Sequence, residues 1–381
     1  RRRMTTVATA GQASGVIVRR FDETAGWTDE HRIEGGWPTA APGNGGWTTS
    51  VVDLETRLEH TTREGALEVP GADTRPAALI GPRLAHYAAW ADSGDVLCYV
   101  VPDGQALSLR TWRRGETGFR THLSASPLFP AWVPGTSQLL CHHGASLTAF
   151  DAVSGDQRML SATATGFRTP AVRDDGGSIA WAEVDAGQVH VMTSRLQGES
   201  ARAASFPNGI ALGFRPGSGE LTVAVATSPE SGIFGEVVTL AGEEGARRLV
   251  KGPLAAFWWA PNGEKIITLH PTYSGDGRFQ ARLHDARGRF VGAMESLIPA
   301  RDTASMIGFF DQFAVSHPCW SADSRWFGIC GRTLTEGPHP SFSGGQGDFA
   351  WAWDTRTRGL PQNLGAATML VLGVFMIGVG W

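Results

Sequence analysis

Two histidines stand at similar positions in two copies of a repeated sequence motif. His86 lies four residues before Trp90, and His317 lies three residues before Trp320. Imidazole is the commonest metal ligand in proteins, and it also exchanges a proton near neutral pH. Repeats around a common axis would bring both side chains to the mouth of that axis, which makes His86 and His317 candidate binding residues. The alternative is that each imidazole only satisfies nearby backbone groups.

A second group of histidines could hold a divalent metal ion. Its members are His270, His284, His317 and His339. No His-x-His spacing accompanies them, so the sequence offers no compact pair of imidazoles for a metal. A metal-dependent site is therefore an alternative hypothesis, whereas the main prediction includes no cofactor and no catalytic residue.

The familiar catalytic motifs are absent from the sequence. It contains no Gly-x-Ser-x-Gly nucleophile elbow, no Walker loop, no His-Glu-x-x-His helix and no EF-hand loop. The four cysteines show no Cys-x-x-Cys spacing, and Cys98, Cys141 and Cys330 fall in apolar strands where we expect them to be buried. The pattern favours a binding protein over an enzyme.

The candidate residues are set in a repeat of a recognisable kind. Residues 318–330, PCWSADSRWFGIC, predict two short apolar strands joined by a tight polar bend. Intervals of 42, 40, 42, 45 and 61 residues separate the aromatic or apolar anchors before the turns, which are Trp90, Trp132, Val172, Phe214, Trp259 and Trp320. A period of about 40 to 45 residues with four short strands is typical of a β-propeller blade, because one sheet cannot bury both faces without neighbours.

The repeat also assigns structural roles to its most prominent residues. The tryptophan anchors are expected to pack between blades, where their large apolar area is buried. The small polar residues of the turns are expected to bond their own backbone two residues further on. These turn residues are Asp92, Asp175, Asn262 and Asp323.

The composition fits a turn-rich all-β protein. The 381 residues include 49 Gly and 21 Pro, and only 18% are charged. The net charge is −4, and the only basic run is Arg1 to Arg3, so nucleic acid is not expected as the main partner. The first twenty residues are too polar for a convincing signal-peptide core.

The two ends of the chain suggest how the propeller closes. Residues 1–14 are predicted to be an N-terminal extension and residues 15–381 a single propeller domain, with strands at 15–22 and 47–57. Residues 364–381, LGAATMLVLGVFMIGVGW, contain no charge. They could supply a closing strand that completes the first blade, or they could anchor the chain in a membrane.

The longest interval between anchors contains an insertion. In residues 287–315, apolar side chains recur loosely at helical spacing between Gly292 and Phe313, although Pro299 interrupts them. We expect a partly helical insertion on one rim, where a rigid scaffold commonly presents specificity.

The turn motif resembles that of a known family. Residues 318–330 and Trp259-Ala-Pro-Asn-Gly resemble the WD40-like repeat of TolB-type β-propellers, over roughly residues 83–360. The resemblance implies the blade architecture, protein partners and an association with the cell envelope. The fragment HPSFS at His339 is similar to one in oligogalacturonate lyases, which implies, as an alternative, a metal-dependent propeller enzyme.

The sequence as a whole predicts an all-β fold. We expect a β-propeller of seven four-stranded blades, closed by strands from both termini. The expected function is non-catalytic binding or scaffolding, with a protein partner on one rim at residues 287–315 and 334–348. A membrane-tethered accessory subunit, held through residues 364–381, is a further alternative.

Overall fold

The computed structural model describes the chain in segments. They are residues 4–11, 15–22, 26–34, 37–41, 48–52, 59–62, 87–113, 116, 119–164, 168–229, 231–240, 245–272, 277–299, 307–316, 319–321, 323–333 and 350–356. Before residue 87, the backbone alone is described. His86, His317, His339, residues 334–348 and residues 364–381 lie outside these segments, so the expectations placed on them stay predictions.

Four sheets of four consecutive antiparallel strands follow one another along the chain from Tyr87 to Leu254. The first sheet consists of β7(Tyr87–Trp90), β8(Val96–Asp103), β9(Ala106–Arg113) and β10(Phe119–Ala125). The second consists of β11(Leu128–Trp132), β12(Gln138–His143), β13(Ser146–Asp151) and β14(Gln157–Ser161). The third sheet consists of β15(Ala171–Val172), β16(Ile179–Asp185), β17(Gln188–Ser194) and β18(Ala201–Phe206). The fourth consists of β19(Ile210–Phe214), β20(Leu221–Ala226), β21(Phe234–Leu240) and β22(Ala246–Leu254).

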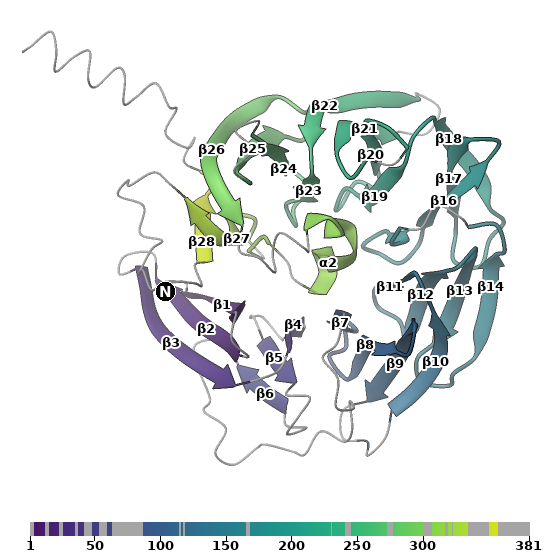
Figure 1. The fold of residues 1–381 in the computed structure, drawn as a ribbon, viewed down its shortest axis with the longest axis horizontal. Helices are drawn as coiled ribbons and strands as arrows, with labels where there is room; N and C mark the ends of the chain where they lie inside the picture. Colours follow the sequence, from purple (N-terminus) through teal and green to yellow (C-terminus); the bar gives the residue numbers. More distant parts are fainter. Residues whose placement is uncertain are drawn as a thin grey trace, which may run out of the picture.

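The remaining described strands extend this arrangement on both sides. A six-stranded sheet contains β23(Ala256–Trp259), β24(Lys265–Pro271), β25(Phe279–Asp285), β26(Phe290–Pro299), β27(Trp326–Thr333) and β28(Ala350–Asp354). Two three-stranded sheets contain β1(Met4–Gly11), β2(Gly15–Asp22) and β3(Gly26–Glu34), then β4(Trp37–Ala41), β5(Thr48–Val52) and β6(Glu59–Thr62). The sheets stand around a common axis as in a β-propeller (Figure 1).

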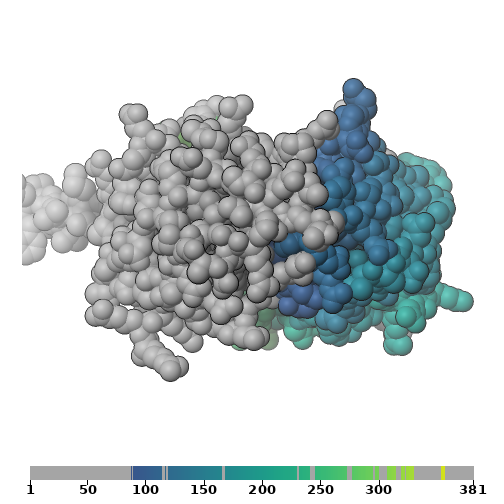
Figure 2. Space-filling model, turned by 90° about the horizontal axis from the view of Figure 1, so that it is seen from below, coloured from purple at the N-terminus to yellow at the C-terminus, as the bar shows by residue number. Residues whose placement is uncertain are grey.

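Burial explains why the strands within a blade differ in composition. The second strands are covered on both faces, and β20, LTVAVA, is buried at every residue. The outer strand β14, QRMLS, borders solvent: its first three residues are exposed and the last two half-buried. Continuous apolar runs on the inner strands and more polar outer strands therefore follow from the stacking of the blades. In the space-filling view, the blue to teal part of the chain packs together on one side (Figure 2).

The tryptophan anchors tie each blade to the one before it. Trp132 Nε1 donates to the carbonyl oxygen of Ala89 at 2.9 Å, and Trp320 Nε1 donates to that of Trp258 at 3.2 Å. Trp259 Nε1 donates to the Thr222 hydroxyl, also at 2.9 Å. The predicted packing of these side chains between blades is confirmed for all three.

The turn residues act in two ways. Asp175, Asn262 and Asp323 each accept a hydrogen bond from the backbone N–H two residues further on, as predicted. Asp92 instead accepts one from Gly135 N–H, in the turn of the following blade. Asp174 makes the equivalent bond to Gly217 N–H.

The predicted partly helical insertion does contain a helix, but its first part is a strand. Residues 290–299 form β26, which pairs with β25, and among the described residues of the insertion the helix is α2(Phe310–Ser316). The helical spacing of the apolar residues was misleading because pairing with β25 determines the backbone conformation there. The helix contacts the inner strands β7, β11, β19 and β23, so it lies at the centre of the ring rather than at its outer edge (Figure 1).

The N-terminal strands begin earlier than expected. β2 spans Gly15–Asp22, as predicted, and β1 pairs with it along its whole length. β1 therefore lies within residues 1–14, which the sequence analysis assigned to an extension. β5, within the strand predicted at 47–57, is the middle strand of its sheet. Among the described residues, no helix has the length and apolar character needed to cross a membrane.

Candidate functional site

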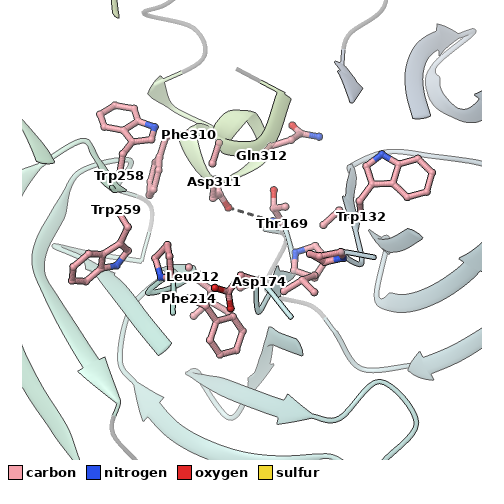
Figure 3. A pocket seen from close by; sticks show the side chains of 18 of the residues that line it. Trp132, Thr169, Asp174, Leu212, Phe214, Trp258, Trp259, Phe310, Asp311 and Gln312 are labelled. Atoms are coloured by element: carbon pink, nitrogen blue, oxygen red, sulfur yellow. Dashed lines mark hydrogen bonds between the residues drawn. The ribbon is translucent and has the colours of Figure 1, made fainter. Parts of the chain in front are cut away.

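A cavity of about 520 Å³ lies beside α2, among the inner strands. Its walls come from β11, β15, β19 and β23, from the turns that follow them, and from the helix. It therefore collects residues from several blades at one place. Figure 3 shows these side chains converging from different elements.

Most of the cavity wall is aromatic or proline. The repeat anchors Trp132, Phe214, Trp259 and Trp320 line it, together with proline residues of the strands and turns such as Pro134 and Pro216. The anchors thus serve two purposes, because the side chains that pack the blades also form the cavity surface. Concave apolar walls with a few polar groups are typical of ligand sites.

Aromatic contacts hold α2 against the inner strands. The ring of Phe310 packs edge-on against Phe257, with centroids 5.0 Å apart, and against Trp258 at 6.0 Å. Phe313 packs against Tyr87 at 5.9 Å. Buried aromatic pairs of this kind stabilise the packing beyond the area that they bury.

A buried ion pair fixes the helix to the segment before β15. Arg168 Nη2 lies 3.0 Å from Asp311 Oδ1, and only 3% of the Asp311 side chain is exposed. The same guanidinium donates through Nη1 to the carbonyl oxygen of Gly308 at 3.1 Å. Asp311 Oδ2 accepts a longer bond, of 3.3 Å, from the backbone N–H of Thr169. These contacts join α2 to the entry of β15.

Two buried polar atoms of the cavity wall have no hydrogen-bond partner among the described residues. They are the hydroxyl of Thr169 and the amide nitrogen, Nε2, of Gln312. Their side chains belong to residues that are 7% and 2% exposed. Buried polar groups are normally paired, so these atoms mark a place where a ligand could bind.

The turns add negative charge to the same cavity. Asp92 and Asp174 line it and are exposed. Thr169 precedes β15 and Asp174 lies in the turn that follows it, so these two polar residues line the cavity at opposite ends of one inner strand.

Two of the predicted histidines lie together in a blade. His270 and His284 are both buried, and each Nε2 lies beside the hydroxyl of Thr268, at 2.9 and 3.2 Å. Burial lowers the pKa of His270 to about 4 and also lowers the pKa of His284, so both imidazoles are neutral at pH 7. Neither lines the cavity. Among the described residues, no three His, Cys, Asp or Glu side chains gather as a metal site.

The buried polar residues of the cavity are not among the residues predicted from the sequence. Thr169 and Gln312 belong to no motif. The pair Asp311 and Gln312 does interrupt an otherwise apolar run, GFFDQFAV, and a polar pair inside such a run is a signal that could have been used. The run itself was noticed for its apolar spacing alone.

Comparisons with known proteins define the class of protein. Neither a protein-family model nor a curated protein sequence matches the chain. A solved oligogalacturonate lyase in complex with manganese has a TM-score of 0.50 and 10% identity, over 93% of this chain and 83% of that one. TolB from Acinetobacter baumannii has a TM-score of 0.42 and 12% identity, over 75% and 78% of the two chains.

A third solved structure, the Dos1 propeller, has a TM-score of 0.47 and 8% identity, over 68% of this chain and 74% of that one. At these identities the likeness concerns the fold alone. The chain is an all-β propeller, as predicted from the repeat, because consecutive four-stranded antiparallel sheets stand around a common axis. TolB proteins are among the solved structures to which it is similar. The number of blades, predicted as seven, stays a prediction.

Proposed function

We propose that this protein is a non-catalytic β-propeller binding module that takes a segment of a protein partner into the cavity beside α2. The observation that carries the proposal is the cavity itself, which is concave, rich in aromatic and proline residues and bordered by few polar groups. Aromatic grooves of this type bind extended segments through apolar side chains and proline. The proposed contact surface is therefore the cavity beside α2, and not a loop on the rim of the propeller.

The dimensions of the cavity support an extended ligand. The wall includes Thr169 before the inner strand β15, the strand itself and Asp174 in the turn after it, so a segment that follows this wall can contact it with several residues. The volume of about 520 Å³ accommodates only part of such a segment. We propose that one or two apolar side chains enter the cavity while the flanking residues lie along the turns.

The charge of the turns supports a basic flank on that segment. Asp92 and Asp174 are exposed, and each uses its Oδ2 to accept a hydrogen bond from a backbone N–H of the next blade. The net charge of the chain is −4. Complementary charge favours specific partners and faster association, so Lys or Arg beside the apolar side chain fits this surface.

The test is a selection of heptapeptides from a random displayed library on the immobilised full chain. We expect enrichment of peptides with an aromatic or apolar residue next to Lys or Arg. Ala314→Trp places a large ring on the exposed position of α2 that lines the cavity, and it should abolish binding of the selected peptides. Val153→Trp, on an exposed turn outside the cavity, is the matched control and should bind normally.

Two results would count against the proposal. One is a selection that yields no related set of sequences. The other is equal binding of the selected peptides by Ala314→Trp and by the wild-type chain, which would place the contact away from the cavity.

A further inference from the structure

Thr169 and Gln312 have no part in the packing that the repeat explains. We infer that they form a subsite that takes a neutral hydrogen-bond acceptor of the ligand, namely an amide carbonyl oxygen of the bound segment. The inference rests on the proposed function and adds the chemical group that the cavity selects.

The two donors make no hydrogen bond among the described residues, so a ligand acceptor would complete their bonding without displacing a partner. The Thr169 hydroxyl and Gln312 Nε2 are buried, line the cavity and have no partner among the described residues. Figure 3 shows both side chains at the cavity, beside Asp311. A hydroxyl and a primary amide can both donate to one carbonyl oxygen, which has two lone pairs. The buried environment makes such bonds stronger than they are in water.

The surrounding contacts hold the two donors in place. Asp311 accepts from the backbone N–H of Thr169 and pairs with the guanidinium of Arg168. Gln312 follows Asp311 in α2, so one carboxylate connects the elements that carry both donors. His142 also braces the segment before β15, because its Nδ1 lies 2.7 Å from the carbonyl oxygen of Arg168. Donors on fixed elements favour one ligand geometry over others.

The charges around Thr169 and Gln312 favour an amide over a carboxylate as the ligand group that binds there. Arg168 already pairs with Asp311, so its positive charge is matched before a ligand enters. A ligand carboxylate next to Thr169 would lie near the carboxylate of Asp311 and would add an unmatched negative charge to a buried site. An amide carbonyl accepts the same two hydrogen bonds without that cost.

The test uses the full chain and two probes of similar size, 2-phenylacetamide and 2-phenylacetate, titrated at pH 7 with ligand-detected NMR. We expect the wild-type chain to prefer the amide about tenfold, as one or two hydrogen bonds allow. Thr169→Val and Gln312→Met should each weaken amide binding about five- to tenfold and leave phenylacetate binding almost unchanged. Thr121→Val, on the exposed outer strand β10, is the control and should match the wild type.

A second readout separates this role from a structural one. Without ligand, Thr169→Val and Gln312→Met should unfold at the same temperature as the wild type or higher, because each removes an unpaired buried polar group. A clear loss of stability in both variants would contradict the inference. The variants lie on different elements, so misfolding of one leaves the other as a test.

The possible failures can be told apart. The subsite is rejected, and the cavity retained, if Ala314→Trp blocks both probes while Thr169→Val and Gln312→Met bind the amide as the wild type does. Equal affinity of the wild type for the two probes also rejects the subsite. If neither probe binds, or if Ala314→Trp leaves both bound, the proposed function fails as well.

Discussion

The carboxylate of Asp92 accepts a hydrogen bond of 2.7 Å from the backbone N–H of Gly135, 43 residues later in the chain. Asp174 makes the same contact with Gly217, also 43 residues further on, at 2.8 Å. Gly135 and Gly217 have φ values of 70° and 71°, a backbone conformation that favours glycine. A carboxylate in one turn and a glycine in the next therefore link neighbouring blades beside the cavity.

Removal of this link should weaken the contact between blades. Asp92→Asn keeps an acceptor but removes the charge, and Asp92→Ala removes both, so we expect Ala to cost more, about 1 to 2 kcal/mol of unfolding free energy. Urea unfolding followed by circular dichroism measures the difference. Asp185→Asn, at an exposed position in β16, should change stability little, and an equal loss in this control would show that the link has no special role.

The anchor Trp320 should be sensitive to both size and hydrogen bonding. It is 4% exposed, packs edge-on against Phe327 and donates to the carbonyl oxygen of Trp258. Trp320→Ala should cost about 3 to 5 kcal/mol because it leaves a large cavity. Trp320→Phe keeps most of the apolar volume and should cost clearly less. Thermal unfolding of the two variants checks the order, and a loss below about 1 kcal/mol for Trp320→Ala would contradict the packing described for the anchors.

Acid should destabilise the protein through its buried histidines. Burial lowers the pKa of His270 to about 4, whereas an unfolded histidine titrates near 6.5. The unfolded chain therefore binds a proton first as the pH falls, so the contribution of His270 is complete above about pH 6.5 and is lost progressively down to about pH 4. Burial lowers the pKa of His122 to about 4 as well, which adds to the same trend.

Urea unfolding at a series of pH values between 7.5 and 4.5 measures this dependence. The stability of His270→Gln should fall less steeply with pH than that of the wild type, since Gln cannot take up the proton. Identical slopes for the two chains would mean that His270 is already protonated in the folded protein at pH 5.

The ion pair of α2 should show strong coupling between its two residues. Asp311→Asn leaves the guanidinium of Arg168 largely buried without its charge partner, so we expect a loss of about 3 kcal/mol or more. Arg168→Met combined with the same Asp311→Asn change removes both charges and should restore most of that loss. A double-mutant cycle by urea unfolding measures the coupling. Additive effects of the two single changes would show that the pair does not hold the helix.

The sequence was most informative where the repeat recurs. The packing of Trp132, Trp259 and Trp320 follows from the anchor spacing, because each copy of the motif must bury the same surfaces. Outside the repeat, the bounds of β2 follow from its own apolar run. The region of residues 290–299 was misread because its spacing suits a helix, while pairing with β25 makes it a strand. Local spacing does not reveal such a partner.

The cavity could not be predicted from the sequence, for a related reason. Thr169 and Gln312 are 143 positions apart and line the same cavity only because α2 lies at the centre of the ring. The chemistry of imidazole made the histidines candidate metal ligands, yet His270 and His284 contact Thr268 within a blade. Residue type identified polar groups, whereas only the fold showed which of them face a cavity.

The central claim is that a peptide segment binds in the cavity beside α2, and the intrinsic fluorescence of the chain tests it most directly. Trp132, Trp259 and Trp320 line the cavity, so a bound apolar side chain should alter their emission. Titration with a heptapeptide from the selection should give a saturable change in the wild-type chain and in Val153→Trp, and no change in Ala314→Trp. A saturable change of the same size and midpoint in Ala314→Trp would contradict the claim.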